Sequence, residues 1–241
     1  MTCNMEYQKI NTLFKRDANN IIIPSQFTQL EFEYLKDNKF ECTEKIDGTN
    51  IRIEIKGKEI TFKGRTERAV IPTHLLNYLK TTFTPEVVFK ALGIDPCIGC
   101  NENSTAVIYG EGYGMKIQSG GNYIKKGVGF IVFDVKIDHW WLGREDIEAI
   151  AKKLGTTAVP LIGYMTIPEA IEYVKKGFKS TIAENKDYDA EGLVLKTPNG
   201  LLFRNGSRII LKLKTIDFTK FKNKYGDDPN PIQPVNPKYN E

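Results

Sequence analysis

Residues 44–50 read Glu-Lys-Ile-Asp-Gly-Thr-Asn, and this short stretch decides how the rest of the chain is interpreted. Lys45 stands two residues before an Asp-Gly turn, between segments that we expect to be strands. A lysine amine can attack phosphorus once it has lost its proton and is held in line with the leaving group. A K-x-D-G match alone recurs by chance. It gains meaning only if the chain also supplies metal-binding carboxylates, phosphate-binding cations and an aromatic ring.

Composition places the chain among ordinary globular proteins. It has 241 residues, of which 41% are hydrophobic and 27% charged, and this length buries a sizeable core. The formal net charge of +4 permits a nucleic-acid partner without requiring one. We find no signal-peptide pattern and no apolar run near the roughly 18 residues of a membrane span. We therefore expect a protein of the reducing cytoplasm.

The chain has four cysteines: Cys3, Cys42, Cys97 and Cys100. Cys97 and Cys100 form a C-x-x-C in a loop rich in proline and glycine. Two ligands with no second pair nearby make a poor zinc site, so two reduced cysteines are favoured over a structural metal or a redox role.

Hydrophobic periodicity predicts a mixture of strands and helices. Ile51, Ile53 and Ile55 alternate with charged residues, which is the pattern of a half-buried strand. Residues 112–127 are rich in glycine and lysine and are expected to form a surface loop. The other strands are predicted over residues 60–62, 105–110, 128–135, 191–196, 201–204 and 208–214, and helices over residues 29–36, 73–92, 144–154 and 167–178.

The segment 208–214 alternates cationic and apolar residues. A period of two puts Arg208, Lys212 and Lys214 on one face, with apolar side chains on the other. Such a strand can clamp a phosphate. The alternative is an edge strand whose lysines resist aggregation.

Carboxylates and aromatics complete the set. Glu111 lies in YGEGYG, where glycines allow close approach of backbone to a ligand, and Glu191 opens EGLVLK. Displacement at a phosphate needs a divalent metal, and magnesium prefers a few carboxylates plus waters. In FIVFDV, Phe130 or Phe133 can stack on a base, although core packing is the alternative for both.

The order of these motifs resembles the covalent nucleotidyltransferase superfamily of polynucleotide ligases and mRNA capping enzymes. The resemblance covers about residues 40–216 and rests on EKIDGTN, KGRTER, YGEGYG, FIVFDV, EGLVLK and LKLK. DNA ligases and capping enzymes typically carry arginine where Asn50 stands. Within the superfamily the chain is therefore most similar to the RNA ligase 2-like branch and its small phage-encoded ligases.

The resemblance implies an α+β fold: a single nucleotidyltransferase (ATP-grasp-like ligase adenylation) domain, with antiparallel sheets around a central nucleotide groove and flanking helices. We expect this domain over residues 1–225 and a tail over 226–241. The 241 − 214 = 27 residues after Lys214 are too few for an OB-fold or a C-terminal ligase domain.

The resemblance also implies an activity, that of an ATP-dependent RNA ligase. Lys45 takes AMP from ATP as a phosphoramidate, AMP passes to an RNA 5′-phosphate, and a 3′-hydroxyl displaces it. The implied cofactors are ATP and Mg²⁺, with Mn²⁺ as a substitute, and the substrate is RNA, including an RNA/DNA hybrid or nicked duplex. The alternatives are a DNA ligase, a guanylyltransferase, or a nucleic-acid-binding module without turnover.

Individual roles follow from the matched motifs. Glu44 contacts the adenine amino group, Phe133 stacks on the ring and Glu111 binds the ribose. Asn50 and Arg65 serve the nucleic-acid steps. The full implied set is catalytic Lys45, Glu191, Lys212 and Lys214; nucleotide-binding Glu44, Ile46, Asn50, Arg65, Glu111, Phe133 and Lys196; and metal-binding Glu111 and Glu191.

Overall fold

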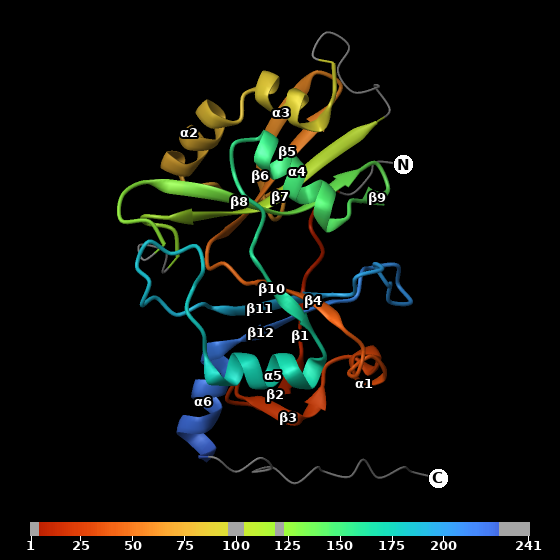
Figure 1. The fold of residues 1–241 in the computed structure, drawn as a ribbon, viewed down its shortest axis with the longest axis vertical. Helices are drawn as coiled ribbons and strands as arrows, with labels where there is room; N and C mark the ends of the chain where they lie inside the picture. Colours follow the sequence, from red (N-terminus) through yellow and green to blue (C-terminus); the bar gives the residue numbers. More distant parts are fainter. Residues whose placement is uncertain (1–4, 96–103, 119–122, 227–241) are drawn as a thin grey trace. The chain divides into compact units, whose positions relative to one another are not determined.

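A computed structural model describes residues 5–95, 104–118 and 123–226. In this part of the chain, helices are mixed with two five-stranded sheets and one two-stranded sheet (Figure 1). Nearly all strand pairs are antiparallel, as predicted, and the pair β1–β12 is parallel. The chain divides into two compact units. Unit 1 comprises Met1–Gln8, Ile46–Pro160 and Thr181–Tyr188, and unit 2 comprises Lys9–Lys45, Leu161–Ser180 and Asp189–Glu241.

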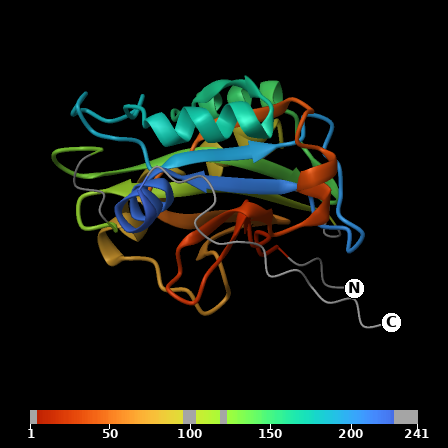
Figure 2. The same cartoon turned by 90° about the horizontal axis from the view of Figure 1, so that it is seen from below.

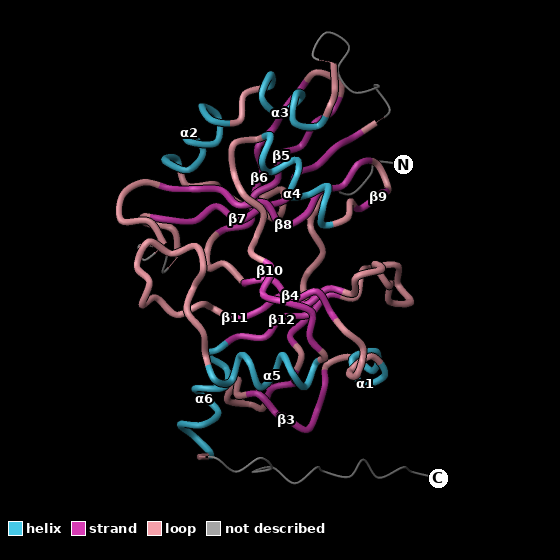
Figure 3. The backbone as a smooth tube through the Cα atoms, in the orientation of Figure 1, coloured by secondary structure: helices cyan, strands magenta, loops and turns pink. Residues whose placement is uncertain are grey.

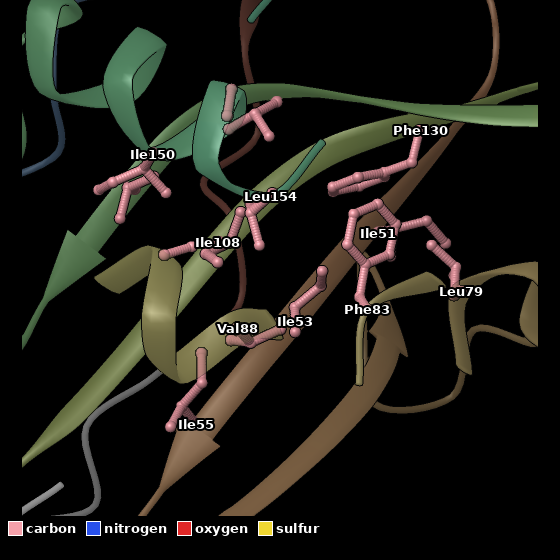
Figure 4. Close-up of a cluster of buried hydrophobic side chains, with 14 of the residues drawn as sticks. Ile51, Ile53, Ile55, Leu79, Phe83, Val88, Ile108, Phe130, Ile150 and Leu154 are labelled. Carbon is pink, nitrogen blue, oxygen red and sulfur yellow. The ribbon is translucent and has the colours of Figure 1, made fainter. Parts of the chain in front are cut away.

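The sheet of unit 1 has the strand order β6-β5-β7-β8-β9. Its strands are β5 (Thr49–Lys56), β6 (Glu59–Gly64), β7 (Thr105–Gly114), β8 (Val128–Ile137) and β9 (Trp140–Trp141). Three helices pack on one face of this sheet: α2 (Thr73–Thr82), α3 (Pro85–Leu92) and α4 (Arg144–Lys153). Figure 4 shows the side chains that fill the space between, with Ile51, Ile53 and Ile55 among them.

The expectation that β5 is half-buried is wrong. Arg52 and Glu54, on the face opposite the three isoleucines, are also buried. The N-terminal segment covers this second face, where the Tyr7 hydroxyl donates to Asp134 Oδ2 at 2.5 Å and the Tyr109 hydroxyl donates to the Met5 carbonyl at 3.0 Å. A local alternation cannot reveal such a cover, because the covering residues are far away in sequence.

The single helix expected over residues 73–92 is two helices. Pro85 begins α3 at a position where its missing N–H costs nothing, and the Thr84 hydroxyl accepts from the Val87 amide at 3.5 Å as the N-cap. A proline inside a continuous helix would remove a backbone hydrogen bond and clash with the preceding turn. The break is therefore encoded at Thr84-Pro85.

The sheet of unit 2 has the strand order β1-β12-β11-β4-β10. Its strands are β1 (Asn11–Thr12), β4 (Phe40–Glu44), β10 (Leu161–Met165), β11 (Gly192–Lys196) and β12 (Ile210–Lys214); β2 (Phe14–Arg16) and β3 (Ile22–Phe27) form a separate hairpin. The helices are α1 (Leu30–Tyr34), α5 (Ile167–Lys176) and α6 (Thr215–Tyr225). Figure 2 shows α5 beside β11 and β12. The core of this unit includes Leu193, Leu195, Leu211 and Leu213.

Several boundaries differ from the sequence prediction. The predicted strand 201–204 is only an isolated bridge between Leu202 and Arg208, and α6 was not predicted. The segment between α5 and β11 is a long loop that carries one bridge, between Lys179 and Asp189 (Figure 3). No helix in the described ranges is long and apolar enough to cross a membrane.

Of the cysteines and the predicted tail, the structure describes only Cys42 and Gly226. Cys42 is buried in the core of unit 2, and burial raises the pKa of its thiol to about 12. Cys3, Cys97, Cys100 and residues 227–241 lie outside the described residues.

Asp17 joins the β2–β3 turn to the C-terminal end of α6. Its carboxylate accepts from the Ile21 and Asn19 amides, each at 2.9 Å, and from the Tyr225 hydroxyl at 2.9 Å. The backbone hydrogen bond from Ile21 is the main cause that lowers the pKa of Asp17 from 3.8 to about 2. The carboxylate form is thus the one that holds the end of the helix.

We expect the end of α6 to loosen in acid. The folded-state pKa of Asp17 is depressed. Its contribution to the stability of this helix end is therefore complete above pH 3.8 and is lost as the pH falls through about 2. Hydrogen exchange of the α6 amides should accelerate over this window. In an Asp17→Asn variant the exchange should already be faster at neutral pH. Equal α6 protection in the variant and the native chain would contradict this role.

Candidate active site

Unit 2 brings together three of the four residues predicted to be catalytic. Lys45 Nζ donates to Glu191 Oε2 at 2.5 Å, and Lys214 Nζ lies 2.7 Å from Glu191 Oε1. The side chains keep 20%, 16% and 32% of their surface exposed for Lys45, Glu191 and Lys214 respectively, so solutes can reach them. One carboxylate therefore bridges two ammonium groups at an accessible position.

The pairing of three strands explains this convergence. β11 lies between β4 and β12, with Leu193 opposite Glu44 and Gly192 opposite Lys214. The Lys45 amide continues the β4–β11 ladder by donating to the Gly192 carbonyl at 2.9 Å. The end of β4, the start of β11 and the end of β12 consequently lie side by side at the same end of the sheet. Segments about 150 residues apart are joined here by backbone pairing.

The alternation predicted for the last strand is confirmed for residues 211–214, whereas Arg208, predicted on the same face as the two lysines, lies before β12 and is buried. Leu211 and Leu213 are buried in the core, while Lys212 and Lys214 share the opposite face and remain partly exposed. The edge-strand alternative is wrong, because β12 lies between β1 and β11.

Lys196 shares the face of Lys212 and Lys214 but not their end of the sheet. It lies opposite Glu41, at the other end of β11. Five residues of extended chain separate it from Glu191, roughly 16 Å. The structure therefore does not bring its backbone to the Lys45 end.

Glu44 points to the other side of the sheet from Lys45. It is buried, and Ser180 Oγ donates to its Oε1 at 2.5 Å in a contact that is also buried. Ser180 was missed by the sequence analysis. It belongs to none of the motifs and lies 136 residues from Glu44, so no local signal marks it.

In unit 1, the predicted residues Asn50 and Glu111 lie directly opposite each other on β5 and β7. Among the described residues, the buried Oδ1 atom of Asn50 has no hydrogen-bond partner. Buried polar atoms are normally paired, so an unpaired acceptor needs an explanation, and a donor from a ligand is one.

The glycines around Glu111 have a packing role. A Cβ on Gly48 would lie 2.3 Å from the Gly112 carbonyl oxygen, and one on Gly110 would lie 2.3 Å from the ring of Phe130. The loop after Lys45 therefore packs directly on the strand that carries Glu111. Glycine here serves close approach within the protein, where the sequence suggested close approach to a ligand.

The two candidate stacking rings have different environments. Phe130 is buried in the core, with its ring centroid 5.3 Å from that of Phe83. Phe133 sits at a β-bulge, because Asp134 pairs with Tyr109 while Val132 pairs with Gly110, and its ring remains half-buried. Of the two, Phe133 is the ring that keeps access to solvent.

The other predicted residues of unit 1 divide between core and surface. Ile46 is buried in a cluster that includes Tyr123, whereas Arg65 is exposed on the turn after β6. The Tyr123 hydroxyl accepts from the Asp47 amide at 3.0 Å and so fixes the turn that follows Lys45. Sequence reasoning missed this contact, which joins positions 76 residues apart.

The donor set fits a metal only in a limited way. Among the described residues, no three His, Cys, Asp or Glu side chains are grouped to hold an ion. Glu191 is a carboxylate already shared by two lysines, and Glu111 belongs to unit 1. The described carboxylates therefore form no cage of protein ligands, and a hard divalent ion bound by either one would keep most of its waters.

A separate cavity in unit 2 contains none of the predicted site residues. It has a volume of about 550 Å³ and lies between α5, α6 and the β2–β3 hairpin, with Phe14, Ile171, Phe218 and Phe221 in its wall. The candidate active site is therefore identified by the contacts of Lys45, Glu191 and Lys214 and not by this cavity.

The chain belongs to the RNA ligase family, whose model matches residues 38–214. No match was found among curated proteins.

Among solved structures, the chain is similar to the RNA ligase of Naegleria gruberi. One such structure, of a mutant with ATP and manganese, is 21% identical with a TM-score of 0.58, over 90% of this chain and 59% of that one. Another, with pyrophosphate, is 21% identical with a TM-score of 0.58, over 92% and 60%. A third, of a mutant with AMP and manganese, is 20% identical with a TM-score of 0.57, over 92% and 60%. The likeness establishes a shared fold, and this chain spans about three fifths of the length of those proteins.

Proposed function

We propose that this chain is an ATP-dependent RNA ligase that carries AMP covalently on Lys45. The observation that supports this most directly is the cluster of Lys45, Glu191 and Lys214, in a chain of the RNA ligase family. A lysine held at 2.5 Å from a carboxylate, with a second lysine on that carboxylate, has the parts for attack on a phosphate.

In the first step, Lys45 Nζ attacks the α-phosphorus of ATP. A P–N bond forms, the bond to the bridging oxygen breaks, and pyrophosphate leaves. Glu191 is placed to orient the amine and to receive its proton, and Lys214 and Lys212 offset the negative charge on the α-phosphate. A divalent ion at Glu191, with Glu111 as the second proposed ligand, would shield the other phosphate oxygens.

Two transfers complete the reaction. The RNA 5′-phosphate attacks the lysyl-AMP, which regenerates the Lys45 amine and forms a 5′–5′ anhydride. A 3′-hydroxyl then attacks the 5′-phosphorus and releases AMP, which joins the RNA ends. We propose Mg²⁺ as the ion, Mn²⁺ as a substitute, and the RNA ligase 2-like, phage-type branch as the subgroup.

The remaining residues bind and orient the substrates. Glu44, held by Ser180, accepts from the adenine amino group, and Phe133 stacks on the ring. Glu111 binds the ribose, and the unpaired Oδ1 of Asn50 accepts a donor from the substrate. Ile46, Arg65 and Lys196 complete the proposed nucleotide and RNA contacts.

We further propose that both units work as one adenylation domain over residues 1–225, followed by a tail over 226–241. The support is that the family match, residues 38–214, includes segments of both units.

Labelling with ATP tests the proposal. Incubation with ATP labelled at the α-phosphate, together with Mg²⁺, should give a labelled protein that is stable in alkali and labile in acid. Labelled GTP should give none. The labelled protein should then join RNA ends, and strict preference for DNA 3′-hydroxyl ends would contradict the choice of RNA. A native chain that takes no label from ATP would overturn the enzymatic proposal.

A further inference from the structure

A network of charges holds the turn over residues 64–68, here named the arginine turn; Arg52 and Glu54 are buried, whereas Lys63 and Glu67 are partly exposed. The fully buried side chain of Arg52 donates from Nε to the Gly64 carbonyl at 2.8 Å and from Nη2 to Glu67 Oε1 at 3.0 Å. Its Nη1 lies 2.7 Å from Glu54 Oε1, an ionic contact without hydrogen-bond geometry. The Arg52 guanidinium is thus hydrogen-bonded both to Gly64, the first residue of the turn, and to the Glu67 side chain within it.

Lys63 closes the network. Its Nζ lies 2.8 Å from Glu67 Oε2 and 3.3 Å from Glu54 Oε2. Two cations therefore balance two anions, and both oxygens of Glu67 are occupied. The hydrogen bonds from Lys63 and then Arg52 lower the pKa of Glu67, which favours its ionised form, while the side chain stays 59% exposed.

The backbone of the turn is fixed as well. The Ala69 amide donates to the Thr66 carbonyl at 3.1 Å, and the Glu67 amide donates to Glu6 Oε1 at 3.0 Å. Arg65 and Arg68 are exposed, and no hydrogen bond or ion pair of either is found among the described residues. Glu67, the acid between them in sequence, has its two carboxylate oxygens paired with Arg52 and Lys63 instead.

We propose that the arginine turn is a preformed binding surface for RNA phosphates, with Arg68 as a second phosphate-binding residue beside Arg65. Arg52 is its positioning residue: it fixes the turn and withholds the Glu67 carboxylate from the two exposed guanidinium groups. Guanidinium groups suit phosphate oxygens because their planar forks donate in pairs, and a rigid turn lowers the entropy lost on binding. This inference rests on the proposed function, since it names how that site holds RNA.

Surface substitutions test the binding residues. We expect Arg68→Ala to weaken binding of a fluorescent, 5′-phosphorylated single-stranded RNA about three- to tenfold, and to reduce the salt slope of log K by about 0.7. Arg65→Ala should act similarly, and Arg204→Ala, an exposed arginine of unit 2, should leave both quantities unchanged. Labelling of Arg68→Ala by ATP should be as in the native chain. An unchanged affinity and salt slope in Arg68→Ala would overturn the proposal.

A second pair of variants tests the positioning role. Arg52→Lys keeps the buried charge but cannot bond Gly64, Glu54 and Glu67 in a fork, so RNA affinity should fall while ATP labelling persists. Arg52→Lys/Glu67→Gln should recover the part of the affinity that is lost to the released Glu67 carboxylate, because a neutral amide does not pair with the exposed arginines. No recovery, or an equal loss of labelling, would show a purely structural network and overturn this part. The RNA titration needs no turnover, so its failure is separate from failure to label with ATP.

Discussion

Lys45→Ala is expected to lose formation of the AMP–protein adduct altogether. The methyl group cannot attack phosphorus, and Lys214, which also pairs with Glu191, lies at Oε1 rather than at the Oε2 that Lys45 contacts. Removal of a nucleophile that acts with its neighbours as a unit lowers turnover by about four orders of magnitude or more. The measurement is the protein-bound label after incubation with ATP and Mg²⁺, normalised to folded protein.

Two further variants separate chemistry from charge. Lys45→Arg keeps a cation beside Glu191, but a guanidinium stays protonated and is a poor nucleophile, so it too should give no adduct. Lys39→Ala removes an exposed lysine that pairs with Glu169 in the same unit and should label normally. Label that persists in Lys45→Ala would move the covalent site to another residue.

The sequence indicates features that depend on local periodicity. The apolar faces of β5 and β12 follow from a period of two, and both are buried as expected. The break at Pro85 could also have been predicted, since Thr84-Pro85 is an N-cap followed by a proline at the first helical position.

Features that depend on contacts between residues far apart in the sequence could not be predicted from it. The burial of Arg52 requires the N-terminal segment and the arginine turn, and the contact of Ser180 with Glu44 spans 136 residues. The convergence of Lys45, Glu191 and Lys214 could be predicted only in part. Motif resemblance implied it, but the physical cause is the order of β4, β11 and β12 in one sheet, which no single segment encodes.

Gly192→Ala is expected to destabilise the chain by roughly 2–4 kcal/mol. Gly192 has φ +149°, and a Cβ there would lie 2.0 Å from the Leu213 carbonyl oxygen and 2.9 Å from the Lys214 Cα. These are backbone atoms of the paired strand, so no side chain can move aside. The strands must separate where Lys45 and Thr215 donate to the Gly192 and Glu191 carbonyls. Thermal or denaturant unfolding measures the loss.

The expected loss of stability in Gly192→Ala has two causes, a steric clash and backbone strain. Gly200→Ala introduces the strain without the clash and so separates the two. Gly200 also has a positive φ, +66°, but nothing lies within 4 Å of its added Cβ. It should lose only the strain of a left-handed alanine, about 1 kcal/mol. Equal losses in the two variants would contradict the clash. Because the separation occurs between Glu191 and Lys214, Gly192→Ala should also lose ATP labelling at temperatures where it is still folded, whereas Gly200→Ala should retain it. The same glycine that lets β11 pair closely with β12 therefore also sets the spacing of the lysine–glutamate–lysine cluster.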